Sequence, residues 1–277
     1  MTQIMSKRSK EKTTRSSSSA SSRNNKMASV LLGIAGIILA LFLYSANGNH
    51  AQETTKGSAV VEEVGSKRAS SSGSTEKIII SSGSVNSIPF YHCGTENNIN
   101  ENKHLVLLHG AKFTKEDWKT SGILKSLCKA KGLSVSAMDL PVSAGHQELK
   151  TLLASMQTEG MLNTPVTLVT PSASGKTITD WMTNGDLTEL PSYISKWIPV
   201  AAGSVSSPSD EQVGSLKGKL SILAIYGSRD AMGKRVTERL AELASAETLE
   251  VEGGHPCYLD SPDDFVSAIF RSMDVST

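Results

Sequence analysis

The feature that most restricts the fold of this chain is an alternation of short apolar runs with helical patterns, between residues 105 and 272. The apolar runs lack a polar residue at every second position, which is typical of strands buried on both faces. Strands that alternate with helices indicate a parallel sheet with right-handed crossovers. The predicted strands are 105–108, 133–138, 166–169, 197–201, 220–226 and 248–251, and the predicted helices are 114–130, 146–158, 175–184, 233–244 and 262–272.

Two further apolar runs precede this region, at 77–80 and 87–92, and a Ser-Gly segment separates them. This pattern predicts an antiparallel hairpin. With the six later strands it brings the sheet to eight. Only residues 202–219 lie between the sixth and seventh predicted strands, which leaves no room for a lid domain. We therefore expect an open or shallow pocket.

The composition divides the chain into four parts. Residues 1–27 are basic and rich in serine, which predicts a disordered tail. Residues 28–46 are apolar and carry no charge, and a helix of this length spans about 28 Å, close to the hydrocarbon thickness of a membrane. Residues 47–75 read as a flexible stalk, and residues 76–277 as the globular domain.

Charge predicts the orientation of the 28–46 segment. Seven Lys and Arg residues precede it, whereas only Lys56 lies in the 20 residues that follow. The positive-inside rule then predicts a single-pass type II membrane protein, with the N-terminus cytoplasmic and the domain luminal or extracellular. Two alternatives remain: cleavage of a signal peptide after Ser45-Ala46, which would give a secreted protein, and a buried core helix.

Other compositional features exclude several functions. The chain has a net charge of +1, and because the tail is strongly basic the rest is slightly acidic, so we expect no nucleic-acid partner. Cys93, Cys128 and Cys257 are too few and too scattered for a disulfide framework or a zinc site, and an odd count leaves at least one free thiol. We expect neither a metal nor a cofactor.

Three motifs carry the predicted chemistry: Thr170-Pro-Ser-Ala-Ser174-Gly, Tyr226-Gly-Ser-Arg-Asp230 and Gly253-Gly-His255-Pro. Each follows a predicted strand, and parallel strands end at one edge of the sheet. A serine becomes a nucleophile when an imidazole takes its proton and a carboxylate orients that imidazole. The order Ser, Asp, His is that of an α/β-hydrolase triad. We predict Ser174 as nucleophile, Asp230 as acid and His255 as base.

Alternatives exist for each of these residues. Asp230 suits the N-cap of the next helix, and Asp139 and Asp180 are alternative acids. Counted from Ser174, the position two residues later should be small, and Lys176 departs from that pattern. Residues 170–177 also resemble a phosphate-binding loop, although a proline within them removes a needed N–H group.

An oxyanion hole is predicted beside the nucleophile. His109-Gly110 follows the strand 105–108, and we expect the N–H groups of Ala111 and Gly175 to face the oxyanion. Cys257, two residues after the predicted base, is interpreted as a packing thiol, with an oxidation-sensitive neighbour of the site as the alternative.

Several segments together resemble the α/β-hydrolase domain-containing 14 family over residues 77–272. They are Leu-Leu-His109-Gly-Ala-Lys-Phe113, Asp139-Leu-Pro141, Pro171-Ser-Ala-Ser174-Gly, Tyr226-Gly-Ser-Arg-Asp230-Ala-Met-Gly233 and Gly254-His255-Pro-Cys-Tyr-Leu-Asp260. The resemblance implies a lidless α/β-hydrolase fold, with a mostly parallel eight-stranded sheet and helices on both faces. It also implies hydrolysis or transfer of small acyl groups, and a type II anchor in members with a leading apolar segment.

This chain departs from the family after Pro141, where Val142–His146 replaces the usual Gly-x-Gly turn beside the pocket. Our leading hypothesis is a membrane-anchored serine hydrolase that cleaves small acyl esters or amides through an acyl-enzyme. Water releases the acyl group, or a thiol such as coenzyme A accepts it. The alternative is a catalytically silent interaction protein with the same fold, which Lys176 and the altered 142–146 loop would favour.

Overall fold

The computed structural model describes residues 60–62, 78–94 and 103–275. All of them belong to one compact unit, Lys56–Thr277. The predicted tail (1–27) and the predicted membrane segment (28–46) lie outside the described residues. Among the helices that the structure describes, none is both long and apolar enough to cross a membrane.

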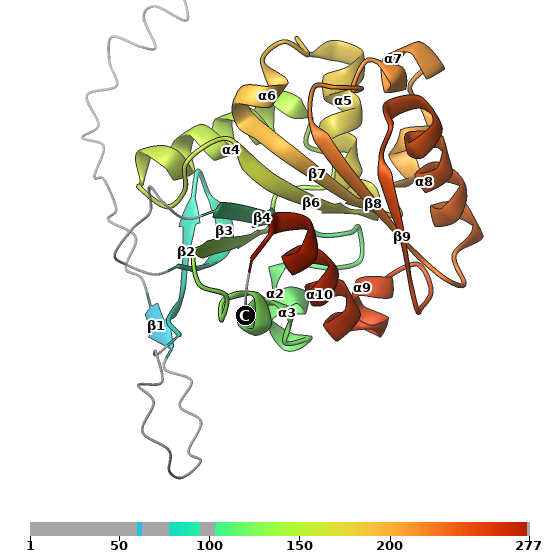
Figure 1. The fold of residues 1–277 in the computed structure, drawn as a ribbon. Coiled ribbons are helices and arrows are strands. Elements are labelled where there is room, and N and C mark those ends of the chain that lie inside the picture. Colours follow the sequence, from blue (N-terminus) through green and yellow to red (C-terminus); the bar gives the residue numbers. More distant parts are fainter. Residues whose placement is uncertain (1–59, 63–77, 95–102, 276–277) are drawn as a thin grey trace, which may run out of the picture. The chain divides into compact units, whose positions relative to one another are not determined.

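The described strands form one nine-stranded sheet, in the order β1-β2-β3-β5-β4-β6-β7-β8-β9 (Figure 1). In this order, the first three neighbouring pairs (β1 with β2, β2 with β3, and β3 with β5) are antiparallel. Every later pair, from β5 with β4 to β8 with β9, is parallel. The sheet is thus the predicted eight strands plus β1, an edge strand within the range predicted as a stalk. The strands are β1 (Val60–Glu62), β2 (Ile80–Val85), β3 (Ile88–Cys93), β4 (Lys103–Leu107), β5 (Leu133–Met138), β6 (Val166–Pro171), β7 (Ile194–Val200), β8 (Ser221–Gly227) and β9 (Glu247–Val251).

The predicted hairpin is present as β2 and β3. Val85 pairs with Ile88 across a two-residue turn, Asn86-Ser87, and both turn residues have positive φ. Such turns match the right-handed twist of paired strands, and asparagine tolerates this conformation better than most residues. The hairpin joins the parallel strands through β3 and β5.

Helices cover both faces of the sheet, and each face has its own apolar core (Figure 1). Trp181 and Trp197 are fully buried on one face, and Trp118 and Phe265 on the other. The first face carries α4 (His146–Thr158), α5 (Lys176–Asn184), α6 (Leu190–Tyr193), α7 (Asp210–Gly214) and α8 (Ala231–Ala244). The second carries α2 (Lys115–Thr120), α3 (Ile123–Leu127), α9 (Cys257–Asp260) and α10 (Pro262–Met273).

The single helix expected over 114–130 is divided into α2 and α3, because Gly122 between them has φ of +81°. The connection over 202–219 contains only a short 3-10 helix, Gly203–Ser206, and α7. No lid domain occurs in this described segment, as predicted.

The three cysteines were predicted to form no disulfide framework, but Cys93 and Cys128 form one disulfide. Cys93 ends β3 and Cys128 follows α3, and the fold brings their Cα atoms to 5.9 Å although 35 positions separate them. Spacing along the sequence does not reveal this proximity. Cys257 is the buried free thiol. Disulfides persist mainly in oxidising compartments.

Candidate active site

Ser172, Asp230 and His255 form a continuous hydrogen-bonded chain at the carboxyl edge of the parallel strands. His255 Nε2 lies 2.8 Å from Ser172 Oγ, and His255 Nδ1 lies 2.7 Å from Asp230 Oδ2. With Nδ1–H donating to the carboxylate, Nε2 is left as an acceptor for the serine hydroxyl. This is the arrangement that activates a serine nucleophile.

The prediction that Ser174 faces the histidine is wrong. Its hydroxyl donates to the Pro171 carbonyl oxygen at 2.9 Å, and the residue is only 2% exposed. Ser172 comes first after β6 and has φ of +50°, a conformation that costs energy for a residue with a side chain. That backbone conformation is what turns the Ser172 hydroxyl towards His255.

The sequence held a signal for this assignment. A nucleophile elbow needs small residues two positions before and two positions after the serine. Around Ser172 these are Thr170 and Ser174, both small and both buried. The Thr170 hydroxyl also accepts a hydrogen bond of 2.7 Å from Trp197 Nε1. The pattern small-x-Ser-x-small is therefore centred on Ser172, two residues before the predicted nucleophile.

Lys176 consequently no longer departs from the elbow pattern. Its ammonium donates to the Ser143 carbonyl oxygen at 2.8 Å, which ties α5 to the unusual 142–146 loop. The phosphate-loop alternative finds no support, because the Thr177 hydroxyl donates to the Ser174 carbonyl oxygen inside the helix and is buried.

A second tie between α5 and the same loop is the contact between His146 and Asp180. His146 Nδ1 lies 2.6 Å from Asp180 Oδ2, and the His146 main-chain N–H donates to the same oxygen at 2.9 Å. Burial favours the neutral acid, but these bonds and one from Asn184 outweigh it and lower the pKa of Asp180 to about 2. Asp180 is thus a partner of His146 and not of His255.

Asp230 performs both roles that the sequence suggested. Its Oδ1 accepts from Gly233 N–H at 2.9 Å and caps α8, while Oδ2 holds His255. The Asp230 side chain is 8% exposed, so little water competes for it. Asp139, the other alternative acid, accepts from the Lys115 main-chain N–H at the start of α2.

The oxyanion prediction needs one correction. Gly175 does not follow the nucleophile, and a Cβ there would lie 2.6 Å from Ala202 Cβ, so close packing explains this glycine. Ala173 directly follows Ser172 at the start of a helical turn, where N–H groups have no intrahelical acceptor. A Cβ on Gly110 would lie 3.7 Å from Ser172 Cβ, so the loop that carries Ala111 is adjacent to the nucleophile.

Proteins with similar sequences show the family to which this chain belongs. The chain is 31% identical over 174 residues to human "Putative protein-lysine deacylase ABHD14B", and the match covers 58% of this chain and 78% of that protein. The chain belongs to the ABHD14 family of α/β-hydrolases. Human "Protein ABHD14A" is 28% identical over 180 residues, 61% of this chain and 64% of that protein. No protein-family profile matches the chain.

Solved structures share the fold of this ABHD14-family chain. A CIB-like hydrolase from Thermoplasma acidophilum superimposes with a TM-score of 0.55, at 18% identity, over 78% of this chain and 98% of that one. The α/β-hydrolase MGS-MChE2, from a lagoon-sediment metagenome, gives a TM-score of 0.52 at 15% identity, over 70% of this chain and 99% of that one. These likenesses establish the α/β-hydrolase fold.

Two further features of the ABHD14-family domain concern access and reactivity. The His255 side chain is 39% exposed, which agrees with the open site expected of a domain without a lid. Cys257 is fully buried, and burial raises the pKa of its thiol to about 12, so it packs as a neutral group.

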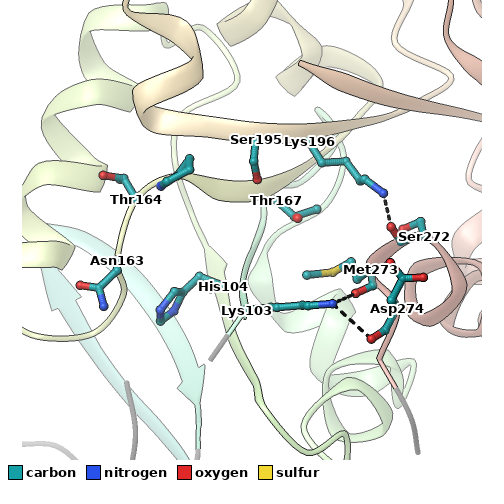
Figure 2. A pocket seen from close by; sticks show the side chains of 11 residues that line it. Lys103, His104, Asn163, Thr164, Thr167, Ser195, Lys196, Ser272, Met273 and Asp274 are labelled. Atoms are coloured by element: carbon teal, nitrogen blue, oxygen red, sulfur yellow. Dashed lines mark hydrogen bonds between the residues drawn. The ribbon is translucent and has the colours of Figure 1, made fainter. Parts of the chain in front are cut away.

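A cavity of about 440 Å³ lies at the opposite edge of the sheet, where the parallel strands begin (Figure 2). Its two lysines have a structural role. Lys103 donates to the carbonyl oxygens of Met273 and Asp274, and Lys196 donates to that of Ser272. These carbonyls lie at the C-terminal end of α10 and on its C-cap, Asp274, where basic side chains commonly stabilise a helix. No group of three or more metal-ligating side chains occurs among the described residues.

Proposed function

We propose that this protein is a serine hydrolase that cleaves small acyl esters or amides, with Ser172 as nucleophile. The observation that carries the proposal is the chain of two hydrogen bonds from Ser172 through His255 to Asp230. The positive φ of Ser172 supports it, since such strain concentrates at functional sites. Lys176 and the 142–146 loop no longer favour a silent protein, because they hold each other in place.

The geometry supports a two-step reaction. Ser172 Oγ attacks the acyl carbonyl and its proton passes to His255 Nε2, while the N–H groups of Ala173 and Ala111 stabilise the oxyanion. Collapse of the intermediate expels the alcohol or amine, which takes the proton from Nε2. A water molecule then gives its proton to Nε2 and attacks the acyl-enzyme. As the second intermediate collapses, Nε2 returns this proton to Ser172 Oγ and the acid is released. A thiol in place of that water would yield a thioester.

One observation suggests a substrate class, and another suggests the compartment in which the domain lies. The relative named as a putative protein-lysine deacylase suggests amides of lysine side chains, and an open site suits a projecting acyl-lysine. The disulfide between Cys93 and Cys128 supports an oxidising compartment. We therefore retain the hypothesis of a type II anchor at residues 28–46 and a luminal or extracellular domain.

Labelling with a fluorophosphonate probe tests the nucleophile. The full chain would be labelled as wild type, Ser172→Ala and Ser174→Ala, and the modified peptide mapped by mass spectrometry. We expect labelling of wild type and of Ser174→Ala on Ser172, and none of Ser172→Ala. Labelling that survives in Ser172→Ala and disappears in Ser174→Ala would refute the assignment, and a folded wild type that never labels would refute the hydrolase.

A further inference from the structure

The loop that carries His255 has little conformational restraint of its own. The pairing of β8 with β9 ends at Gly227 and Val251, and the chain then passes through Gly253 and Gly254. Gly253 has φ of +142°, which only glycine adopts readily. A base that must stay within hydrogen-bonding distance of Ser172 therefore needs restraint from neighbouring segments.

The turn that carries Asp230, residues 227–230, restrains only the first part of this loop. Arg229 N–H donates to the Gly253 carbonyl oxygen at 2.8 Å, and the Ser228 hydroxyl accepts from Gly253 N–H at 3.2 Å. Both bonds involve Gly253, two residues before His255. Neither bond restrains the N–H group of Gly254, the residue directly before His255.

Asp260 supplies this restraint from the end of α9. Its Oδ2 accepts from Gly254 N–H at 2.6 Å, so the carboxylate holds the residue directly before His255. Asp260 N–H donates in turn to the Pro256 carbonyl oxygen at 3.2 Å, so the contacts bracket the base on both sides. A hydrogen bond to a charged acceptor is about twice as strong as a neutral one.

We propose that Asp260 is a positioning residue for His255, a role that rests on the proposed hydrolase function. By fixing Gly254, it keeps His255 Nε2 aligned with Ser172 while Asp230 holds Nδ1. Displacement of a reacting group by about 1 Å can cost about 100-fold in rate. The role of Asp260 would appear in the rate of the chemical step and not in probe affinity.

The nearby ion pairs do not account for this role. Arg229 pairs with Glu252, and its Nη2 lies 3.9 Å from Asp260 Oδ2, but the Arg229 side chain is mostly exposed. Exposed ion pairs contribute little. The bond to Gly254 N–H is therefore the important contact, and asparagine retains an oxygen that accepts it.

The experiment compares Asp260→Ala with Asp260→Asn in the full chain, kept in mild detergent. Fluorophosphonate labelling gives the maximal inactivation rate and the half-saturating concentration, and thermal melting reports folding. We expect Asp260→Ala to lower the maximal rate by about 10- to 100-fold with an unchanged half-saturating concentration. Asp260→Asn should recover most of that loss. Asp264→Ala, which removes a nearby exposed carboxylate, should match wild type.

A second pair of variants deletes the donor in place of the acceptor. Gly254→Pro removes the N–H group, whereas Gly254→Ala keeps it, and a Cβ there meets nothing closer than 3.6 Å. We expect slow labelling for the proline variant and near-normal labelling for the alanine variant. Equal maximal rates in wild type, Asp260→Ala and Gly254→Pro would overturn the positioning role and leave the hydrolase intact. A folded wild type that does not label would instead overturn the proposed function, and the role with it.

Discussion

Removal of the disulfide between Cys93 and Cys128 should lower the stability of the domain by a calculable amount. The bond closes a loop between residues 35 positions apart. The chain-entropy relation for such a loop gives about 3.8 kcal/mol at 25 °C. For a domain of this size each kcal/mol corresponds to roughly 2–4 °C in melting temperature, so we expect a fall of about 8–15 °C.

The assay is thermal unfolding of residues 56–277 produced under oxidising conditions, with and without a reductant. Wild type should lose about 8–15 °C on reduction. The double variant Cys93→Ala/Cys128→Ala should melt near reduced wild type and be insensitive to reductant. Cys257→Ala removes the remaining thiol and should keep the full response to reductant. A reductant response that is absent in wild type, or equal in the double variant, would refute the reasoning.

Three further predictions concern charge and packing. Burial lowers the pKa of His92 to about 4, so the unfolded state binds the extra proton between about pH 6.5 and 4. The free energy of unfolding should therefore fall as pH drops through that window, and at pH 5 it should be about 2 kcal/mol lower than at neutral pH. The fall should be much smaller in His92→Gln, and urea titrations at neutral pH and at pH 5 would measure both. The lowered pKa of Asp180 stabilises the folded state above about pH 4, and because solvent screens part of this interaction, Asp180→Asn should cost about 1 kcal/mol at pH 7. That difference should shrink as pH falls from about 4 to 2, and a constant difference would contradict the assignment. Gly175→Ala should cost about 1–3 kcal/mol, since its Cβ would lie 2.6 Å from Ala202 Cβ, and an unchanged melting temperature would exclude this overpacking.

Much of the fold was readable from local patterns. Uninterrupted apolar runs identified the buried strands, and the short 202–219 connection excluded a lid domain. Helical periodicity predicted one helix over 114–130 and did not reveal the break at Gly122. The positive φ of Gly122 ends α2, yet the apolar residues on both sides of it still follow a helical spacing. The extra edge strand β1 lies in a polar segment whose composition favours a stalk, and its pairing with β2 depends on a neighbour rather than on its own residues.

Local patterns were enough to predict that a serine, Asp230 and His255 meet at one sheet edge, because each motif follows a strand and parallel strands end together. The sizes of the flanking residues favour Ser172 over Ser174, and the packing of the elbow selects it. Ser172 and Ser174 differ in backbone angle and in neighbours, and only the folded elbow turns Ser172 towards His255 while Ser174 bonds to Pro171. The disulfide was likewise beyond the sequence. Local patterns record burial and turns, whereas the direction of a side chain and the meeting of distant residues arise only when the elements pack.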